Sequence, residues 1–332
     1  MNKIDKLSYS RLMEYNNCGY RWNLRYMRKI QRRTESRPMT LGSAVHVGMQ
    51  AVFSGEDFKK AINLWKHQNL ENQIIPVLHE DIESVNEEIT AMYEEVSQTA
   101  EEIVERTLKY FSPDDWEVVV KDGKRMVEVH FESFVFDGIM YQGFVDLIAT
   151  EKATGQNWLI DYKVRKTLQP DSDEEVNLQM ASYQYLAKKA GIDTVGTIAV
   201  QILAKPNSKP KINKDGSMSK AKIATDWFTY KQALIENGLN PADYEEEMKS
   251  KLDSDFVRQS RAYRSAEEVQ NIWDEIIRNM VVNYYSFIPT FRKPNSMNCK
   301  TCWAREFCLE ELRGQNVDHL LENQYQYIKG GE

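Results

Sequence analysis

A run of β-type segments between Trp116 and Val164 limits most strongly what this chain can fold into. The run contains stretches rich in β-branched and aromatic residues, namely WEVVV, MVEVHFESFVF, MYQGFVDLIA and NWLIDYKV. Short sequences that favour tight turns separate them: Lys-Asp-Gly, Asp-Gly and Thr-Gly. The pattern predicts antiparallel strands joined by hairpins.

Helical patterns lie on both sides of these strands. The segment VNLQMASYQYLAKKAG predicts a helix that ends on Gly191, and VGTIAVQILA after it predicts a further strand. Before the strands, LGSAVHVGMQAVF predicts a helix that begins near Thr40 or Ser43. Residues 56–110 predict a helical insertion that is interrupted near Pro76. These elements together indicate a mixed α/β fold.

The two ends of the chain also have helical patterns. The N-terminal segment predicts two short helices broken near Cys18 and Gly19, with Ser8 as the N-cap of the first. Residues 205–222 are polar and rich in lysine, proline and glycine, which predicts an exposed loop or a disordered segment. Helix returns over residues 265–286.

Composition excludes some classes of protein. Hydrophobic residues make up 42% of the chain, as in proteins with a packed core, and no stretch approaches the run of about 18 apolar residues that a membrane helix needs. The polar start MNKIDKLSYS lacks the apolar region of a signal peptide, so we expect a cytoplasmic protein with no membrane partner. The net charge of −7 argues against nucleic-acid binding through global electrostatics, although a basic face can coexist with a negative average. No G-x-x-x-x-G-K-[ST] phosphate loop occurs, so any helicase must be a separate chain.

The strand WLIDYKV carries two chemical groups on one face. Side chains alternate along a strand, so Asp161 and Lys163 point the same way while their apolar neighbours point the other. The preceding strand holds Asp146, and a hairpin through EKATGQN would bring both aspartates within reach of one cation. Mg²⁺ or Mn²⁺ bound there could activate water against a phosphodiester, with Lys163 orienting the water or stabilising the transition state. By itself, however, D-x-K also occurs by chance on exposed strand faces.

Three further side chains follow a suggestive order around these strands. His46 lies on the helix before them, and Gln179 and Tyr183 lie on the helix after them. Because Gln179 and Tyr183 are four residues apart, they share one helical face and can meet a phosphate or brace the lysine. An ordinary hydrogen-bonded helix histidine is the alternative for His46, and core packing is the alternative for Tyr183.

In this order the motifs resemble those of the RecB-type branch of the PD-(D/E)xK nucleases, which includes the CRISPR-associated adaptation nucleases. LGSAVH resembles the first motif of the family, GFVDLI its G-x-x-D strand, IDYKV its central motif and QMASY its Q-x-x-x-Y helix. The resemblance implies a restriction-endonuclease-like mixed sheet flanked by helices. It covers both termini and the core, but not residues 56–110 or 205–260.

The resemblance also implies a function. The chain is expected to be a Mg²⁺- or Mn²⁺-dependent deoxyribonuclease, an exonuclease in replication, recombination, repair or spacer processing. The implied partners are DNA, single-stranded or with free ends, and a separate helicase or recombination protein, in a bacterium or a phage-infected cell. The implied metal ligands are His46, Asp146, Asp161 and the carbonyl of Tyr162, and the implied catalytic residues are Asp146, Asp161, Lys163, Gln179 and Tyr183. Glu128 resembles a supporting acidic position.

Four cysteines stand near the two ends of the chain: Cys18, and then Cys299, Cys302 and Cys308 in the pattern C-x-x-C-x-x-x-x-x-C. Thiols stay reduced in the cytosol, which favours a tetrathiolate metal site over two disulfides, with Zn²⁺ as the general expectation. The distant first cysteine with this C-terminal pattern resembles the iron–sulfur members of the same nuclease family, which implies a [4Fe–4S] cluster. Gly19 is a departure, since the family often has proline there, but both residues suit a break after a helix.

We therefore expect one elaborated nuclease domain over residues 1–332. Its expected parts are N-terminal helices with the first cysteine and the histidine motif (1–50), a helical insertion (56–110), the nuclease core (116–204), a variable region (205–264) and a C-terminal helix with the cysteine cluster (265–332). Two other functions stay open: a non-catalytic nucleic-acid-binding protein and a zinc-stapled RNA-processing protein.

Overall fold

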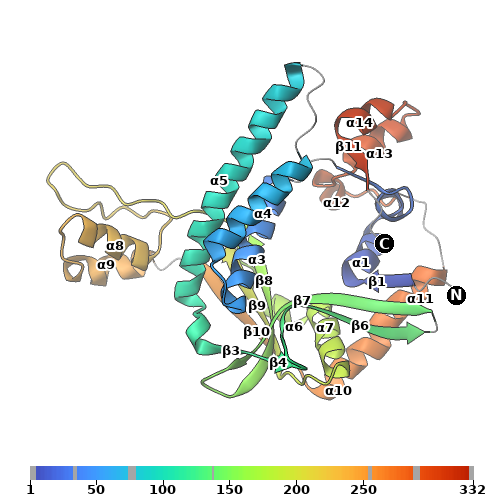
Figure 1. The fold of residues 1–332 in the computed structure, drawn as a ribbon, viewed down its shortest axis with the longest axis horizontal. Helices are drawn as coiled ribbons and strands as arrows, with labels where there is room; N and C mark the ends of the chain where they lie inside the picture. The colour runs from blue at the N-terminus through green and yellow to red at the C-terminus, as the bar shows by residue number, and fades with distance from the viewer. Residues whose placement is uncertain are drawn as a thin grey trace.

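A computed structural model describes residues 5–32, 36–73, 80–136, 138–252, 256–286 and 292–328. Within them, seven strands form one mixed sheet with helices packed on both sides (Figure 1). The strands of this sheet are β1 (Asp5–Ser8), β3 (Trp116–Val118), β6 (Val127–Phe136), β7 (Ile139–Glu151), β8 (Gln156–Arg165), β9 (Gly196–Leu203) and β10 (Val257–Tyr263). Two small ladders pair β2 (Ile30–Arg32) with β11 (Tyr325–Tyr327) and β4 (Val120–Lys121) with β5 (Lys124–Arg125).

Helices fill most of the rest of the described chain. In the N-terminal half they are α1 (Tyr9–Asn17), α2 (Gly19–Trp22), η1 (Asn23–Met27), α3 (Arg37–Ser54), α4 (Phe58–Gln73), α5 (Glu80–Tyr110) and η2 (Pro113–Asp115). After the hairpins come α6 (Ser172–Glu175), α7 (Leu178–Lys189), α8 (Trp227–Glu236), α9 (Ala242–Leu252), α10 (Ala266–Asn271), η3 (Ile272–Ile277), α11 (Arg278–Ser286), α12 (Ser296–Lys300), α13 (Arg305–Leu312) and α14 (Asp318–Asn323).

Strand β7 organises the sheet. It pairs antiparallel with β6 and with β8, so the hairpins predicted at the Asp-Gly and Thr-Gly turns are confirmed. The Lys-Asp-Gly turn joins only the two-residue strands β4 and β5, and β3, which precedes them, pairs with β7 instead. The chain then crosses through α6 and α7 to β9, which runs parallel to β8, and β10 returns antiparallel beside β9. Parallel pairing of β8 with β9 requires such a crossover, and the helical sequence pattern between the two strands indicates one. The predicted mixed α/β fold class is therefore confirmed.

The two faces of the sheet bury different apolar sets. On one face, α3 and α5 pack over side chains such as Ile160 and Tyr162. On the other, α7, η3 and α11 pack over side chains such as Leu159 and Ile148. Neighbouring residues of β8 thus enter opposite cores, as the alternation of side chains along a strand requires. On the first face, α3 and α5 pack closely against each other. A Cβ on Gly48 of α3 would lie only 2.8 Å from the Val104 side chain of α5.

Some predicted boundaries need correction. The helix expected to begin at Thr40 or Ser43 begins at Arg37, since Ser36 is extended and Pro38 fits the first turn, where its missing N–H costs no hydrogen bond. The predicted break between α1 and α2 lies at Cys18, whose backbone is extended, and Ser8 caps α1 as expected. Pro76, predicted to interrupt the helical insertion, lies outside the described residues.

Residues 204–252 form a projection that we call the arm (Figure 1). Its first part is a loop with one bridge between Ile212 and Met218, and α8 and α9 follow. The arm has a small core of its own: Met218, Tyr230, Leu234, Tyr244, Met248 and Leu252. At its base the buried Arg106 of α5 donates to the carbonyls of Leu203 and Lys205, at 2.7 and 2.6 Å.

Among the helices of the described ranges, none combines the length and apolar character needed to cross a bilayer.

Candidate active site

The strands β7 and β8 separate where their acidic residues stand. Their ladder reaches Leu147 paired with Ile160. Next to that pair, the backbone N–H of Tyr162 donates to Oδ2 of Asp146 at 2.7 Å, so a carboxylate accepts a backbone hydrogen of the neighbouring strand. The buried Asp146 side chain is thereby fixed at the fork between the two strands.

Three ligand-bearing side chains converge at this fork. His46 of α3, Glu128 of β6 and Asp146 each offer one atom, and these atoms lie within 4.8 Å of one another. His46 Nδ1 is 3.4 Å from Asp146 Oδ2. Glu128 stands between the pairs that join β6 to β7 on either side of Asp146, and its φ of 49° lies in the left-handed region that side chains other than glycine rarely adopt. Such strain is common where a fold aims a side chain at a site.

The electrostatics of this trio depend on its burial. Burial, and then the charge of Asp146, raise the pKa of Glu128 to about 7. Burial lowers the pKa of His46, but its hydrogen bond to Asp146 and the charges of Asp146 and Asp161 outweigh that effect and leave the pKa raised. A divalent cation would relieve the repulsion between the carboxylates.

Asp161 and Lys163 form an ion pair beside the trio. Lys163 Nζ lies 2.8 Å from Asp161 Oδ2 and donates a hydrogen bond to Oδ1 at 3.1 Å. Burial raises the pKa of Asp161, and Lys163 opposes that shift. Burial lowers the pKa of Lys163, but the charge of Asp161 and its hydrogen bond with the lysine outweigh that effect. The pKa is therefore raised above its ordinary value, and the lysine stays protonated.

The helix α7 brings a polar pair to the same place. Gln179 Nε2 donates to the hydroxyl of Tyr183 at 3.0 Å. The Tyr183 ring covers Gly143 of β7 so closely that a Cβ there would lie 2.3 Å from the ring. The pKa of Tyr183 is raised by burial and then, after an opposing effect of Gln179, by the charge of Asp161. Glycine in the G-x-x-D strand thus makes room for the tyrosine of the helix.

The structure brings the sequence-predicted residues together in three sets: the group of His46, Glu128 and Asp146, the Asp161–Lys163 ion pair, and the Gln179–Tyr183 pair. Glu128, expected only in a supporting position, lies in the group with His46 and Asp146, whereas Asp161 is ion-paired with Lys163 and is outside that group. The pocket over the trio has a volume of about 420 Å³ and is also lined by Ser43 and Gln50 of α3. The sequence interpretation missed both residues, although their spacing of three and four from His46 puts them on its helical face.

The cysteines lie in a separate cluster, which we call the terminal cluster. Its buried residues are Tyr20, Leu24, Ile30, Ala304, Phe307, Leu320 and Tyr325, and Cys18, Cys302 and Cys308 pack against it. All four cysteines are partly buried and free of disulfides. Burial raises the pKa of the Cys308 thiol, and Arg292, whose Nε is 3.2 Å from Cys308 Sγ, opposes that shift.

A sequence profile of the PD-(D/E)XK nuclease superfamily matches residues 6–309. The chain belongs to this superfamily. As a PD-(D/E)XK nuclease it is a phosphodiester hydrolase, and the enzymes of this superfamily use divalent metal ions, which the His46, Glu128 and Asp146 group could bind. The matched range includes all the candidate site residues and the four cysteines, namely Cys18, His46, Glu128, Asp146, Asp161, Tyr162, Lys163, Gln179, Tyr183, Cys299, Cys302 and Cys308.

Two solved structures were also compared with this PD-(D/E)XK nuclease. SSO0001 is 13% identical over 74% of this chain and 94% of its own, with a TM-score of 0.29. A protein from Eubacterium rectale called "Putative exonuclease" is 15% identical over 90% of this chain and 93% of its own, with a TM-score of 0.35. The search of curated proteins found no match.

Proposed function

We propose that this nuclease is a Mg²⁺- or Mn²⁺-dependent exonuclease of the RecB type that acts on DNA ends. The observation that carries the proposal is the position of the His46, Glu128 and Asp146 group at the fork of β7 and β8, beside the Asp161–Lys163 pair. Carboxylates and an imidazole are suitable ligands for the metal ion in metal-assisted hydrolysis of a phosphodiester, and Lys163 provides a positive charge beside them.

The residues fit a divalent cation. Asp161 Oδ2 is buried and accepts no hydrogen bond from the described residues, although Lys163 lies within ion-pair distance. His46, Glu128, Asp146 and Asp161 would hold the ion, together with the Tyr162 carbonyl. One imidazole among carboxylates suits Mn²⁺ at least as well as Mg²⁺, which prefers oxygen. When bound, the ion polarises the phosphate and increases the acidity of water.

The other side chains have roles that follow from their positions. Lys163 is protonated and can donate to the attacking water or to a phosphate oxygen, where negative charge increases in the transition state. The Tyr183 hydroxyl and Gln179 can orient the substrate phosphate through hydrogen bonds. The N–H of Tyr162 holds Asp146 in place and so positions the metal ligands.

The test uses end-labelled single- and double-stranded DNA with Mg²⁺ or Mn²⁺, and an RNA of the same sequence. Mononucleotides or short products released progressively from labelled DNA are the expected result. Binding without hydrolysis under any metal would instead indicate a non-catalytic nucleic-acid-binding protein, and hydrolysis of RNA alone would indicate an RNA-processing enzyme.

We also propose that Cys18, Cys299, Cys302 and Cys308 hold a [4Fe–4S] cluster, with Zn²⁺ as the alternative. The packing of three of these cysteines on the terminal cluster supports the proposal, as does Arg292, which favours a thiolate at Cys308. Such a site would join the first helices of the chain to the last and stabilise both.

A further inference from the structure

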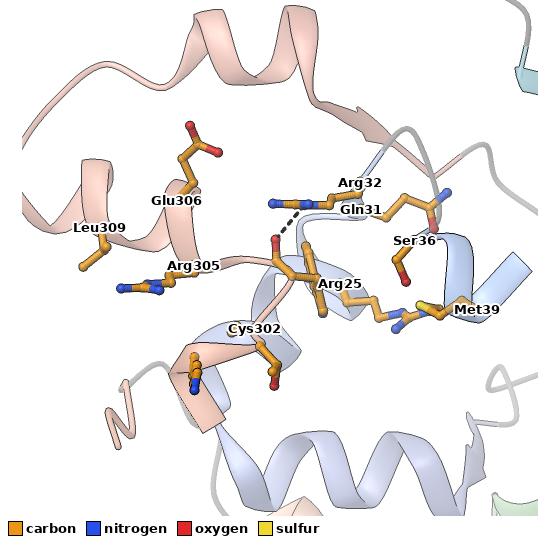
Figure 2. A pocket seen from close by; sticks show the side chains of 12 residues that line it. Arg25, Gln31, Arg32, Ser36, Met39, Cys302, Arg305, Glu306 and Leu309 are labelled. Atoms are coloured by element: carbon orange, nitrogen blue, oxygen red, sulfur yellow. Dashed lines mark hydrogen bonds between the residues drawn. The ribbon is translucent and has the colours of Figure 1, made fainter. Parts of the chain in front are cut away.

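A second pocket, of about 690 Å³, lies where the N- and C-terminal segments meet. Its cationic lining residues are Arg25, Arg32, Lys300 and Arg305, whereas Glu306 is the acidic residue among those that line it. Figure 2 shows Arg25 reaching toward Met39 on one side and Arg305 and Glu306 on a separate helix. A pocket with this excess of positive charge favours an anionic ligand.

Two of these cations are held by the protein and two are available. Arg32 Nε donates to the carbonyl of Trp303 at 3.1 Å, and Arg25 lies 3.7 Å from a carboxylate oxygen of Glu14. The side chains of Lys300 and Arg305 are exposed, and neither side chain makes a hydrogen bond or an ion pair with any residue of the described ranges. Their charge is therefore free to meet a ligand.

The pocket also offers apolar surface. Met39 and Leu309 line it with 57% and 37% of their surface exposed, and the Trp303 side chain lines it as well. Cations that bind phosphates beside side chains against which bases can stack are the combination that holds single-stranded nucleic acid. Inorganic phosphate alone would make no favourable contact with these apolar side chains.

One helix connects this pocket to the active site. Met39 lines the second pocket, which we call the basic pocket. Ser43 and His46 line the pocket over His46, Glu128 and Asp146, and all three of Met39, Ser43 and His46 lie on α3. Spacings of four and seven residues place them on one helical face, and seven residues of α-helix span about 10 Å. A strand lying along that face would pass from one pocket to the other within a few nucleotides.

We propose that the basic pocket binds the single-stranded part of the nucleic-acid substrate a few nucleotides from the scissile phosphate. The position of the pocket relative to a scissile phosphate rests on the proposed nuclease function, whereas binding of single-stranded nucleic acid in the pocket does not. Binding in the pocket itself depends on Lys300 and Arg305, which lie outside the active site.

The test compares the full chain with a Lys300→Gln/Arg305→Gln variant and with Lys231→Gln/Lys249→Gln, a control that removes equal charge from exposed positions on the arm. Binding of a fluorescein-labelled single-stranded 20-mer DNA is followed by anisotropy in EDTA over a series of salt concentrations. For the pocket variant, Kd should rise several-fold and the slope of log K against log salt should become shallower by about 1.4, or about 0.7 per lost phosphate contact. The control should match the wild type.

A second substrate separates the two proposals. The p-nitrophenyl ester of thymidine 5′-monophosphate needs only the metal site, so the pocket variant should hydrolyse it at the wild-type rate while its KM for the 20-mer rises. Equal binding and equal KM in the pocket variant and the control would overturn the pocket and leave the nuclease intact. Wild-type protein that hydrolyses neither substrate, yet shows the difference in salt slope, would overturn the nuclease and support the pocket.

Discussion

Asp146 is both a structural residue and a candidate ligand. Its Oδ2 accepts the N–H of Tyr162 and lies 3.4 Å from His46 Nδ1. A substitution there would leave a buried backbone donor without a partner, so lost activity could follow from lost structure. Asp161 and Lys163 are better probes of the chemistry. Within the described parts of the chain each forms an ion pair with the other alone, and Lys163 is partly exposed to solvent.

We predict that Asp161→Ala and Lys163→Ala each lower the rate of DNA cleavage by at least about 10²-fold, since one removes a candidate ligand and the other the cation near the reacting phosphate. Circular dichroism and DNA binding in EDTA should stay close to wild type. Because the residues act as a unit, the double variant should be little worse than either single one. Cleavage near the wild-type rate in either variant would contradict the assignment.

The pKa of Glu128 gives a prediction about pH. The folded, metal-free protein keeps this proton up to about pH 7, whereas the ordinary value is 4.5, so between these values the folded state binds more protons and its stability falls as pH rises. Metal binding needs the ionised carboxylate. We therefore expect Mn²⁺ to raise the Tm more at pH 8 than at pH 6.

Glu128→Gln is the control for this prediction, because it keeps the shape of the side chain and removes its titration. The pH dependence of the Mn²⁺ effect should become smaller in this variant, and what remains should reflect His46, whose raised pKa acts in the same direction. An equal gain in Tm at both pH values in the wild type would show that Glu128 does not bind the metal.

At the scale of elements, the contact between β7 and α7 fixes the site. Tyr183 lies over Gly143, and its hydroxyl accepts from Gln179. The helix cannot approach the strand in this way if the strand carries a side chain at that position. The position of one glycine therefore determines where the polar pair of α7 stands relative to Asp161.

We predict that Gly143→Ala destabilises the protein by about 1–3 kcal/mol, because the added methyl group would overlap the Tyr183 ring. Urea denaturation followed by circular dichroism measures the effect. In a Tyr183→Ala background, which removes the ring, the same glycine substitution should cost much less. An additive double variant would mean that the strand, and not the ring, requires glycine.

The sequence predicts individual strands and helices better than it predicts the contacts between them. The alternation in WLIDYKV and the turn in EKATGQN were enough to predict the β7–β8 hairpin, because both signals are local. The left-handed backbone of Glu128 and its place opposite Asp146 depend on the β6–β7 register, which no local pattern encodes. The close packing of Tyr183 on Gly143 likewise joins residues 40 positions apart in sequence.

At the scale of the whole molecule, residues from the two ends of the chain share one core. Tyr20 donates to Glu311 at 2.5 Å, and Arg28 pairs with the same carboxylate at 2.6 Å. The ladder between β2 and β11 adds backbone contacts to this junction. The basic pocket is lined by residues of both terminal segments, so no local sequence pattern indicates it.

We predict that protein purified without oxygen is brown, with the broad visible absorbance of iron bound to thiolates, which colourless d¹⁰ Zn²⁺ cannot produce. Cys18→Ser, like a substitution of any other of the four cysteines, should lose the colour and lower the soluble yield, because the terminal cluster would lose its link. Residual cleavage by soluble variant protein is expected, since the proposed catalytic residues lie elsewhere. Stoichiometric zinc without iron would contradict the cluster.

The base of the arm has a consequence for how this enzyme can vary among its relatives. The arm leaves the sheet after Leu203 and returns by Phe256, and the N–H of Leu203 donates to the carbonyl of Phe256 at 2.8 Å. Its entrance and exit are thus hydrogen-bonded neighbours at one end of the β9–β10 hairpin. A descendant gene could lengthen, exchange or delete everything between these two residues and still encode the same hairpin. Recombination at this point would give the nuclease a new attachment without disturbing His46, Asp146 or Lys163.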